Sequence, residues 1–113
     1  MTPKKLSDDL SVTGQVQPSE IADVKRLGFR SLIVNRPDGE GPDQPSFETI
    51  RAAAEAAGLS ARYIPVSGSP GSEQVSAFAT ALDELPKPIL AFCKSGMRSA
   101  ALWQGVQQSR PRG

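Results

Sequence analysis

The single cysteine of this chain is followed by residue types that could hold an anion. Cys93 ends an apolar run, and the next residues are Lys94, Ser95, Gly96, Met97, Arg98 and Ser99. A glycine-containing turn that leads into a helix points backbone N–H groups at one spot, and the helix dipole adds partial positive charge there. The same surroundings favour a thiolate over a thiol. We therefore predict that Cys93 is a nucleophile in an anion-binding loop formed by residues 94–98.

Individual side chains of this loop suit the same chemistry. Gly96 lets the backbone curl so that successive N–H groups face inward. Arg98 offers a planar fork of donors to phosphate, sulfate or thiosulfate oxygens. Ser95 and Ser99 could donate to the thiolate or to the anion, and Ser99 could equally cap the following helix. A lone cysteine often only packs in a core, but this basic turn directly after Cys93 favours a functional thiol.

The chain contains no histidine, which excludes several kinds of site. Cys/His and Ser/His dyads cannot form, nor can most zinc and haem sites. Any nucleophile must therefore be activated by electrostatics, and we expect no metal and no cofactor. The net charge is +1, but no acidic residue follows Glu84, whereas basic residues do: Lys87, Lys94, Arg98, Arg110 and Arg112. This distribution predicts a positive field around the cysteine that attracts anions.

Length and composition indicate one domain that spans residues 1–113. Hydrophobic residues make up 38% and charged residues 22% of the chain, as is ordinary for a globular protein. We find no apolar stretch long enough for a membrane span and no apolar segment typical of a signal peptide near the N-terminus. One cysteine also allows no internal disulfide. We expect a cytoplasmic protein that binds neither membranes nor nucleic acid.

The apolar pattern predicts alternating strands and helices. Segments rich in β-forming residues predict strands at 10–12, 29–35, 62–66 and 89–92. Helical spacing predicts a first helix from Pro18 whose apolar stripe includes Leu27, and a second at 47–57 capped by Ser46. Two more helices are expected at 72–85, capped by Ser72, and from Ser99 to about residue 108, with residues 109–113 frayed.

This alternation predicts an α/β fold, with a mostly parallel sheet of about four strands and helices on both faces. Ligands in such sheets bind beyond the carboxyl ends of the strands. Cys93, Arg36 and Ser67 each follow a different predicted strand. We therefore expect these three residues to meet at one edge, with Arg36 and Ser67 lining the substrate.

A general acid, if the reaction needs one, would come from the acidic loop after the second strand. Asp38, Glu40 and Asp43 lie there, although a solvated acidic loop is the favoured explanation for them. We take Asp38 as the catalytic candidate. Glu73 is the other nearby acid, and it suits the first turn of a helix.

With these residues assembled, the chain resembles the beta-lactamase hydrolase-like family. The resemblance spans roughly residues 6–108 and rests on LSVTGQ at 10–15, GFRSLIVNRPDGE at 28–40, IPV at 64–66 and CKSGMRSAALW at 93–103. Members are called phosphatase-like or sulfurtransferase-like and are similar in fold to tyrosine and dual-specificity phosphatases. The resemblance implies that Cys93 is the nucleophile and that residues 94–98 form the anion loop. Since some members are fused to metallo-beta-lactamase-type domains, it also implies a possible partner of that type.

The chain departs from the tyrosine and dual-specificity phosphatases at three points. Four residues separate Cys93 from Arg98, where those phosphatases have five. Phe92 stands where they usually carry histidine, and the loop at 67–72 lacks the aspartate that serves them as general acid. The shorter spacing resembles the active loop of single-domain rhodaneses, which carry a persulfide on the cysteine.

Three functions remain open from the sequence, and we favour a sulfurtransferase. In that reaction Cys93 takes sulfur from thiosulfate or a small persulfide and passes it to an acceptor thiol, and the leaving group needs no general acid. The alternative is a phosphatase that acts on phosphate monoesters through a Cys93-phosphate intermediate. A non-catalytic anion-binding regulatory module is the third hypothesis.

Overall fold

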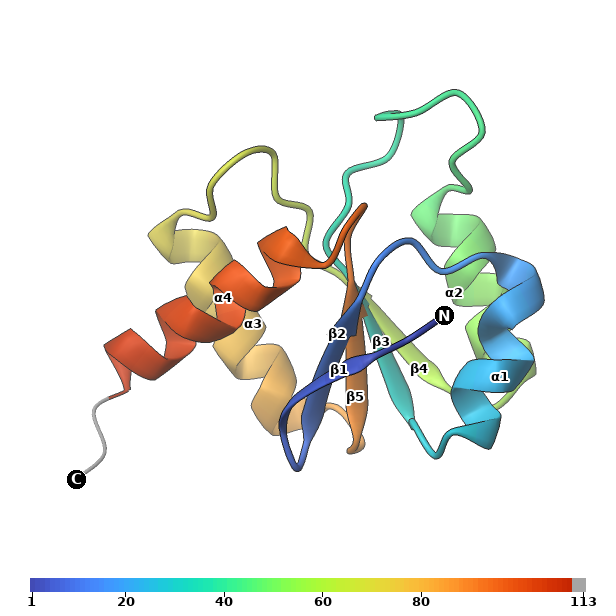
Figure 1. Cartoon of the computed structure of the whole chain (residues 1–113), viewed down its shortest axis with the longest axis horizontal. Helices are drawn as coiled ribbons and strands as arrows, with labels where there is room; N and C mark the ends of the chain where they lie inside the picture. Colours follow the sequence, from blue (N-terminus) through green and yellow to red (C-terminus); the bar gives the residue numbers. More distant parts are fainter. Residues whose placement is uncertain (111–113) are drawn as a thin grey trace.

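A computed structural model shows a five-stranded sheet with helices on both faces, and it describes residues 1–110 (Figure 1). The strands are β1 (Lys4–Ser7), β2 (Leu10–Thr13), β3 (Ser31–Val34), β4 (Ser60–Tyr63) and β5 (Ile89–Phe92). The helices are α1 (Ile21–Arg26), preceded by a 3₁₀ turn η1 (Pro18–Glu20), α2 (Phe47–Ala56), α3 (Ser72–Glu84) and α4 (Met97–Ser109). The strand order is β1-β2-β5-β3-β4, in which β1 alone is antiparallel to its neighbour.

The central strand β5 divides the core into two clusters. Successive side chains of a strand point to opposite faces, so Ile89 and Ala91 join the cluster under α3 and α4. Leu90 and Phe92 face the other way and join the cluster under α1 and α2. All four side chains are fully buried, as expected for a strand covered on both faces. The predicted α/β fold with a mostly parallel sheet and two helical layers is confirmed.

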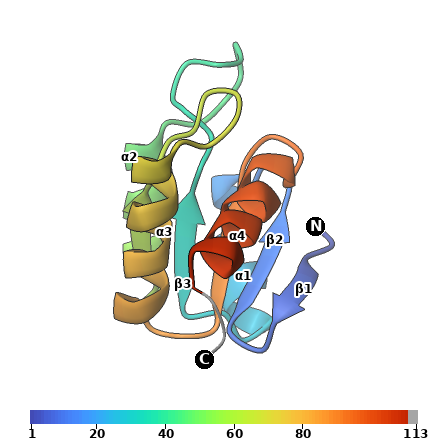
Figure 2. The same cartoon turned by 90° about the vertical axis from the view of Figure 1, so that its left-hand side faces the viewer.

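The carboxyl ends of the parallel strands meet at one edge of the sheet. Thr13 of β2 and Val34 of β3 both pair with Phe92 of β5. The chain segments that follow these strands therefore leave the sheet side by side. Figure 2 shows the loops after β3 and β4 at the same end of the molecule as the turn into α4.

The sheet differs from the prediction in strand number and in strand ends. Strand β1 was not expected, because its exposed lysines and half-buried residues give no clear apolar pattern. Strand β4 begins two residues earlier than predicted and ends at Tyr63. The N–H groups of Ile64 and Val66 still donate to the carbonyls of Val34 and Asn35. Pro65 between them has no N–H and interrupts the ladder.

Several helix ends also differ from those predicted. Leu27 is 59% exposed, because α1 ends before it and turns it away from the core. Gly71, not Ser72, caps α3, and Gly96 precedes α4, so Ser99 lies buried inside the first turn and is not the cap. The Ser46 cap is confirmed, since its hydroxyl accepts the Thr49 N–H at 3.2 Å.

Helix α4 extends to Ser109, beyond its predicted end, and Arg110, also predicted to fray, donates to Asp83. Residues 111–113 of the predicted frayed tail lie outside the described residues. Within residues 1–110, no helix combines the length and apolar composition needed to cross a bilayer.

Candidate active site

The turn between β5 and α4 surrounds the Cys93 thiol with backbone N–H groups. Cys93 is fully buried, and the Gly96 N–H donates to its Sγ at 3.0 Å. Gly96 has φ of 95°, a left-handed conformation that glycine adopts without strain. That conformation turns the chain directly into α4, so the positive end of the helix faces the sulfur.

Two opposing effects set the pKa of Cys93. Burial is the largest single effect and raises the pKa, because it disfavours the charged thiolate. Four backbone N–H groups together outweigh burial and lower the pKa, those of Ser99, Ser95, Arg98 and Gly96. The pKa of Cys93 therefore lies below its ordinary value, and the turn favours the nucleophilic form.

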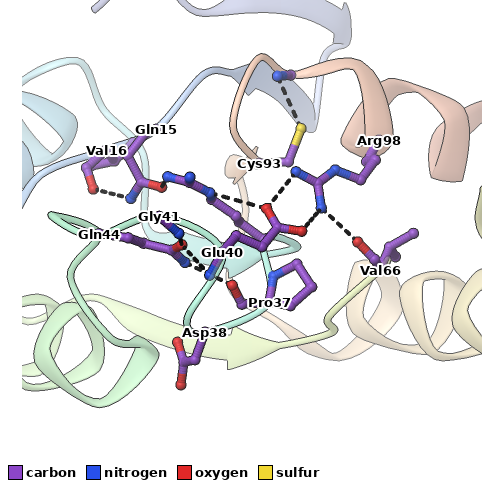
Figure 3. A network of polar contacts seen from close by, with 12 residues as sticks. Gln15, Val16, Pro37, Asp38, Glu40, Gly41, Gln44, Val66, Cys93 and Arg98 are labelled. Atoms are coloured by element: carbon purple, nitrogen blue, oxygen red, sulfur yellow. Dashed lines mark hydrogen bonds and ion pairs between the residues drawn. The ribbon is translucent and has the colours of Figure 1, made fainter. Parts of the chain in front are cut away.

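The Arg98 guanidinium is held in place by a carboxylate from another loop (Figure 3). Its Nη1 donates to Glu40 Oε2 at 2.7 Å and its Nη2 to Glu40 Oε1 at 2.9 Å. Nη1 also donates to the Val66 carbonyl at 2.7 Å. These bonds raise the pKa of Arg98 and lower that of Glu40. Arg98 is thus oriented by two loops that lie far from it in the sequence.

Arg36 is a second cation in the same network. Its side chain is 10% exposed, and its Nε donates to Glu40 Oε1 at 3.2 Å. Its Nη1 donates to Gln15 Oε1 at 3.0 Å. Glu40 therefore bridges two arginines, a role that the sequence analysis missed when it considered this residue only as an acid. Nothing in the spacing of residues 36, 40 and 98 reveals this contact before folding.

The structure does not bring Asp38 to the thiol. Its carboxylate accepts the Phe47 N–H at 2.8 Å at the start of α2, and Figure 3 shows the side chain pointing away from Cys93. The Asp38 N–H donates to the Tyr63 hydroxyl at 2.9 Å. In this arrangement Asp38 organises its own loop and the start of α2.

The remaining predicted site residues lie around the turn with differing exposure. Ser67 is exposed and follows Val66, whose carbonyl binds Arg98. The side chains of Lys94 and Ser95 are exposed, and Met97 is 76% exposed.

A buried asparagine that the sequence analysis did not single out supports the turn from below. The Ser99 hydroxyl donates to Asn35 Oδ1 at 2.7 Å, and Asn35 Nδ2 donates to the Ile64 carbonyl at 2.9 Å. Asn35 has no exposed surface, so both bonds satisfy groups that water cannot reach. These contacts tie α4 to the ends of β3 and β4.

This arrangement suits an anionic substrate and nucleophilic displacement. A thiol with a lowered pKa, inward-facing N–H groups and an oriented guanidinium lie within one turn. Such donors can stabilise negative charge that develops on an oxyanion. Across residues 1–110, no three histidine, cysteine, aspartate or glutamate side chains cluster as metal ligands would.

Comparison with known families confirms the resemblance seen in the sequence. Residues 3–110 match the family model "Beta-lactamase hydrolase-like protein, phosphatase-like domain". A beta-lactamase hydrolase-like protein of Xylella fastidiosa is 37% identical over 99 residues, which cover 87% of this chain and 23% of that protein. Its counterpart in Agrobacterium fabrum is 36% identical over 100 residues, which cover 88% of this chain and 23% of that protein. This chain thus spans about a quarter of the length of these relatives.

Solved structures with this fold include several phosphatases. A proposed phosphatase from Neisseria meningitidis has a TM-score of 0.84 and 29% identity, over 95% of this chain and 78% of that one. Another from Shewanella putrefaciens has a TM-score of 0.80 and 25% identity, over 97% of this chain and 74% of that one. The catalytic core of the PP-IP phosphatase Siw14 from S. cerevisiae, at 17% identity and a TM-score of 0.67 over 94% and 64%, shows the fold alone. The predicted cysteine-phosphatase-like fold is confirmed.

Proposed function

This chain belongs to the phosphatase-like domain family of beta-lactamase hydrolase-like proteins, and from that premise we propose that it is a cysteine-dependent phosphatase of phosphate monoesters. The observation that carries the proposal is the Gly96 N–H at 3.0 Å from Cys93 Sγ, in a turn whose N–H groups lower the thiol pKa. The family and the similar structures support this reaction rather than the sulfurtransferase that the loop length favours.

The reaction proceeds in two displacements at phosphorus. The Cys93 thiolate attacks the phosphate ester, so that an S–P bond forms and the P–O bond to the leaving group breaks. Water then attacks the phosphocysteine, breaks the S–P bond, and releases inorganic phosphate and the thiolate. The inward N–H groups and Arg98 stabilise the charge on the phosphoryl oxygens in both steps.

The surroundings of the thiol favour esters with good leaving groups. Glu40 is a weak proton donor, because its bonds to Arg98 lower its pKa. The Asp38 carboxylate is bound to the start of α2. Loss of general-acid assistance costs about 10²–10⁴ in rate for a poor leaving group. We therefore propose aryl phosphates as the substrates that the isolated chain hydrolyses best.

Sulfur transfer is the second candidate, and the same observations on the carboxylates favour it. In that reaction the Cys93 thiolate attacks the outer sulfur of thiosulfate, an S–S bond forms, and sulfite leaves with the electron pair. An acceptor thiolate then attacks the outer sulfur and regenerates the Cys93 thiolate. Sulfite needs no proton to leave, so neither Glu40 nor Asp38 is required. A metallo-beta-lactamase-type partner is proposed for either reaction, on the resemblance alone.

Intact-mass spectrometry distinguishes these reactions. The protein is incubated separately with an aryl phosphate, thiosulfate and glutathione persulfide, and each sample is quenched in acid. We expect a phosphoryl adduct and phosphate release with the aryl phosphate, and neither in Cys93→Ser. A sulfur adduct that a thiol removes, without phosphate release, would establish the sulfurtransferase instead. No adduct and no turnover with any compound would contradict both reactions and favour a non-catalytic anion-binding module.

A further inference from the structure

A pocket of about 480 Å³ lies beside the nucleophile turn. It is lined by Lys94 from that turn, by Arg36 and Glu40 from the network that holds Arg98, and by Gln15, Gln44 and Asp43. The pocket and the active site thus share Lys94 and Glu40. A molecule bound at Cys93 would have this pocket as its immediate neighbour.

Arg36 presents an open donor to this pocket. Its Nε and Nη1 are bonded to Glu40 and Gln15, but no acceptor in residues 1–110 binds its Nη2. All buried side-chain nitrogen and oxygen atoms of the described residues have a hydrogen-bond partner, so Nη2 is reached by solvent. A Cβ on Gly41 would lie 2.9 Å from Nη2. A side chain at Gly41 would therefore crowd this nitrogen.

Lys94 is a second cationic residue in the lining of the pocket. Its side chain is exposed, and its ammonium forms no ion pair with any residue in the described part of the chain. The Gln15 N–H donates to the Lys94 carbonyl at 3.2 Å and holds its backbone against the pocket. Two cationic residues from separate segments thus line one cavity.

The negative charges at the pocket are unequal in effect. Glu40 is neutralised by two arginines, whereas Asp43 is an exposed carboxylate at the rim. Gln44 organises the loop that carries Glu40, since its Oε1 accepts the N–H groups of Glu40 and Gly41 at 3.1 and 3.2 Å. A ligand anion would therefore be attracted by Arg36 and Lys94 and weakly opposed by Asp43.

We propose that this pocket binds a second anionic group of the substrate, a carboxylate or a phosphate, while the ester phosphate lies in the nucleophile turn. This inference rests on the proposed phosphatase function and makes it more specific. It identifies the substrates as phosphate monoesters that carry another negative charge close to the scissile phosphate. Arg36 Nη2 and the Lys94 ammonium are the groups that select them.

Two matched pairs of compounds test the proposal. Phenyl phosphate and a carboxyphenyl phosphate give a ratio of kcat/KM values. Phenylphosphonate and the corresponding carboxyphenylphosphonate, which are not hydrolysed, give a ratio of affinities for Cys93→Ser by calorimetry. We expect both ratios to favour the carboxylate by about five-fold, as for a well-placed ion pair. Lys94→Met should reduce both ratios towards one and Asp43→Asn should increase them, while Lys25→Met on α1 serves as a remote control.

The two readouts separate this proposal from the proposed function. Discrimination in binding without hydrolysis would support the pocket and contradict the phosphatase. Hydrolysis without discrimination in either ratio would overturn the pocket and leave the phosphatase standing. Equal ratios in wild type and Lys94→Met, or an equal loss in Lys25→Met, would also overturn it.

Discussion

At the scale of single residues, the chemistry depends on how one buried sulfur is solvated. Cys93 has no exposed surface, and burial alone would raise the pKa of its thiol and favour the protonated form. The N–H groups of the following turn take the place of water around the thiolate and lower the pKa instead. The chain contains no histidine, so backbone N–H groups lower the thiol pKa where a Cys/His dyad would use an imidazole.

The first residue-scale prediction concerns the titration of Cys93. Because its pKa is lowered, the thiolate should form at a lower pH in the folded protein than in the unfolded chain. Ultraviolet absorbance of the thiolate measures this without any reagent having to reach the buried sulfur. Since Cys93 is the only cysteine, Cys93→Ser gives the baseline and the urea-unfolded protein gives the reference. A folded-state midpoint at or above that of the unfolded chain would contradict the prediction.

The same shift links stability to pH. Between the two pKa values the unfolded chain binds more protons than the folded one, so the free energy of unfolding rises with pH. The contribution of Cys93 is therefore complete above about 8.5 and is lost as the pH falls through its folded pKa. Comparison with Cys93→Ser at each pH isolates this contribution.

At the scale of elements, the turn between β5 and α4 depends on Gly96. This residue caps α4, takes a positive φ and directs its N–H at the sulfur. A Cβ there would also approach the Thr13 backbone to 3.3 Å. One position thus combines the helix start, the close contact with the end of β2 and the solvation of the thiolate.

Gly96→Ala should therefore damage both stability and the thiolate. The left-handed backbone costs a side-chain-bearing residue about 1–2 kcal/mol, and movement away from Thr13 would displace the N–H from Sγ. We expect a lower free energy of unfolding and a higher Cys93 pKa, measured by denaturant unfolding and thiolate absorbance.

Gly28→Ala is the matched control for this substitution. Gly28 has φ of 99°, but a Cβ there meets nothing within 4 Å, and it lies after α1. It should lower stability and leave the thiol pKa unchanged. An equal pKa change in both variants would show that Gly96 has no specific effect on the thiol.

At the scale of the whole molecule, the parallel sheet gathers residues from distant parts of the sequence. Arg98 meets Glu40 from the loop after β3 and Val66 from the segment after β4. Beneath them, Asn35 connects Ser99 to Ile64 through two buried hydrogen bonds. The site therefore depends on the relative positions of three segments: the residues after β3, the residues after β4 and the start of α4.

A double-mutant cycle between Asn35 and Ser99 tests this connection. Asn35→Ala leaves the Ile64 carbonyl and the Ser99 hydroxyl buried without partners, at a cost of about 1–3 kcal/mol each. Since Ser99→Ala removes one of the same bonds, the effects of the two substitutions on the free energy of unfolding should not add.

Ser31→Ala provides the control for the cycle. Ser31 is also fully buried, and its hydroxyl donates to the Pro86 carbonyl at 2.6 Å, at the opposite end of β3. Its cost should add to that of Asn35→Ala. Additivity in the Asn35–Ser99 pair as well would mean that the bond between them contributes nothing to stability.

Much of the fold was predictable because local patterns specify it. Apolar runs predicted the bounds of β5 and located β3 within the longer segment 29–35, and Ser46 marked the start of α2. Strand β1 was missed, since an edge strand pairs through its backbone and needs no apolar side chains. The start of α4 was misplaced, because Ser99 has the residue type of a cap but is buried against Asn35.

The sequence by itself determined the sheet type, the nucleophile candidate and the cationic turn after it, because these depend on periodicity and on residues close together in the chain. Only the tertiary structure decided which carboxylate faces Arg98, where Asp38 points, and that Arg36 and Lys94 border one pocket. Those relations join segments up to 58 residues apart. Such contacts depend on how strands are ordered in the sheet, which no local spacing records.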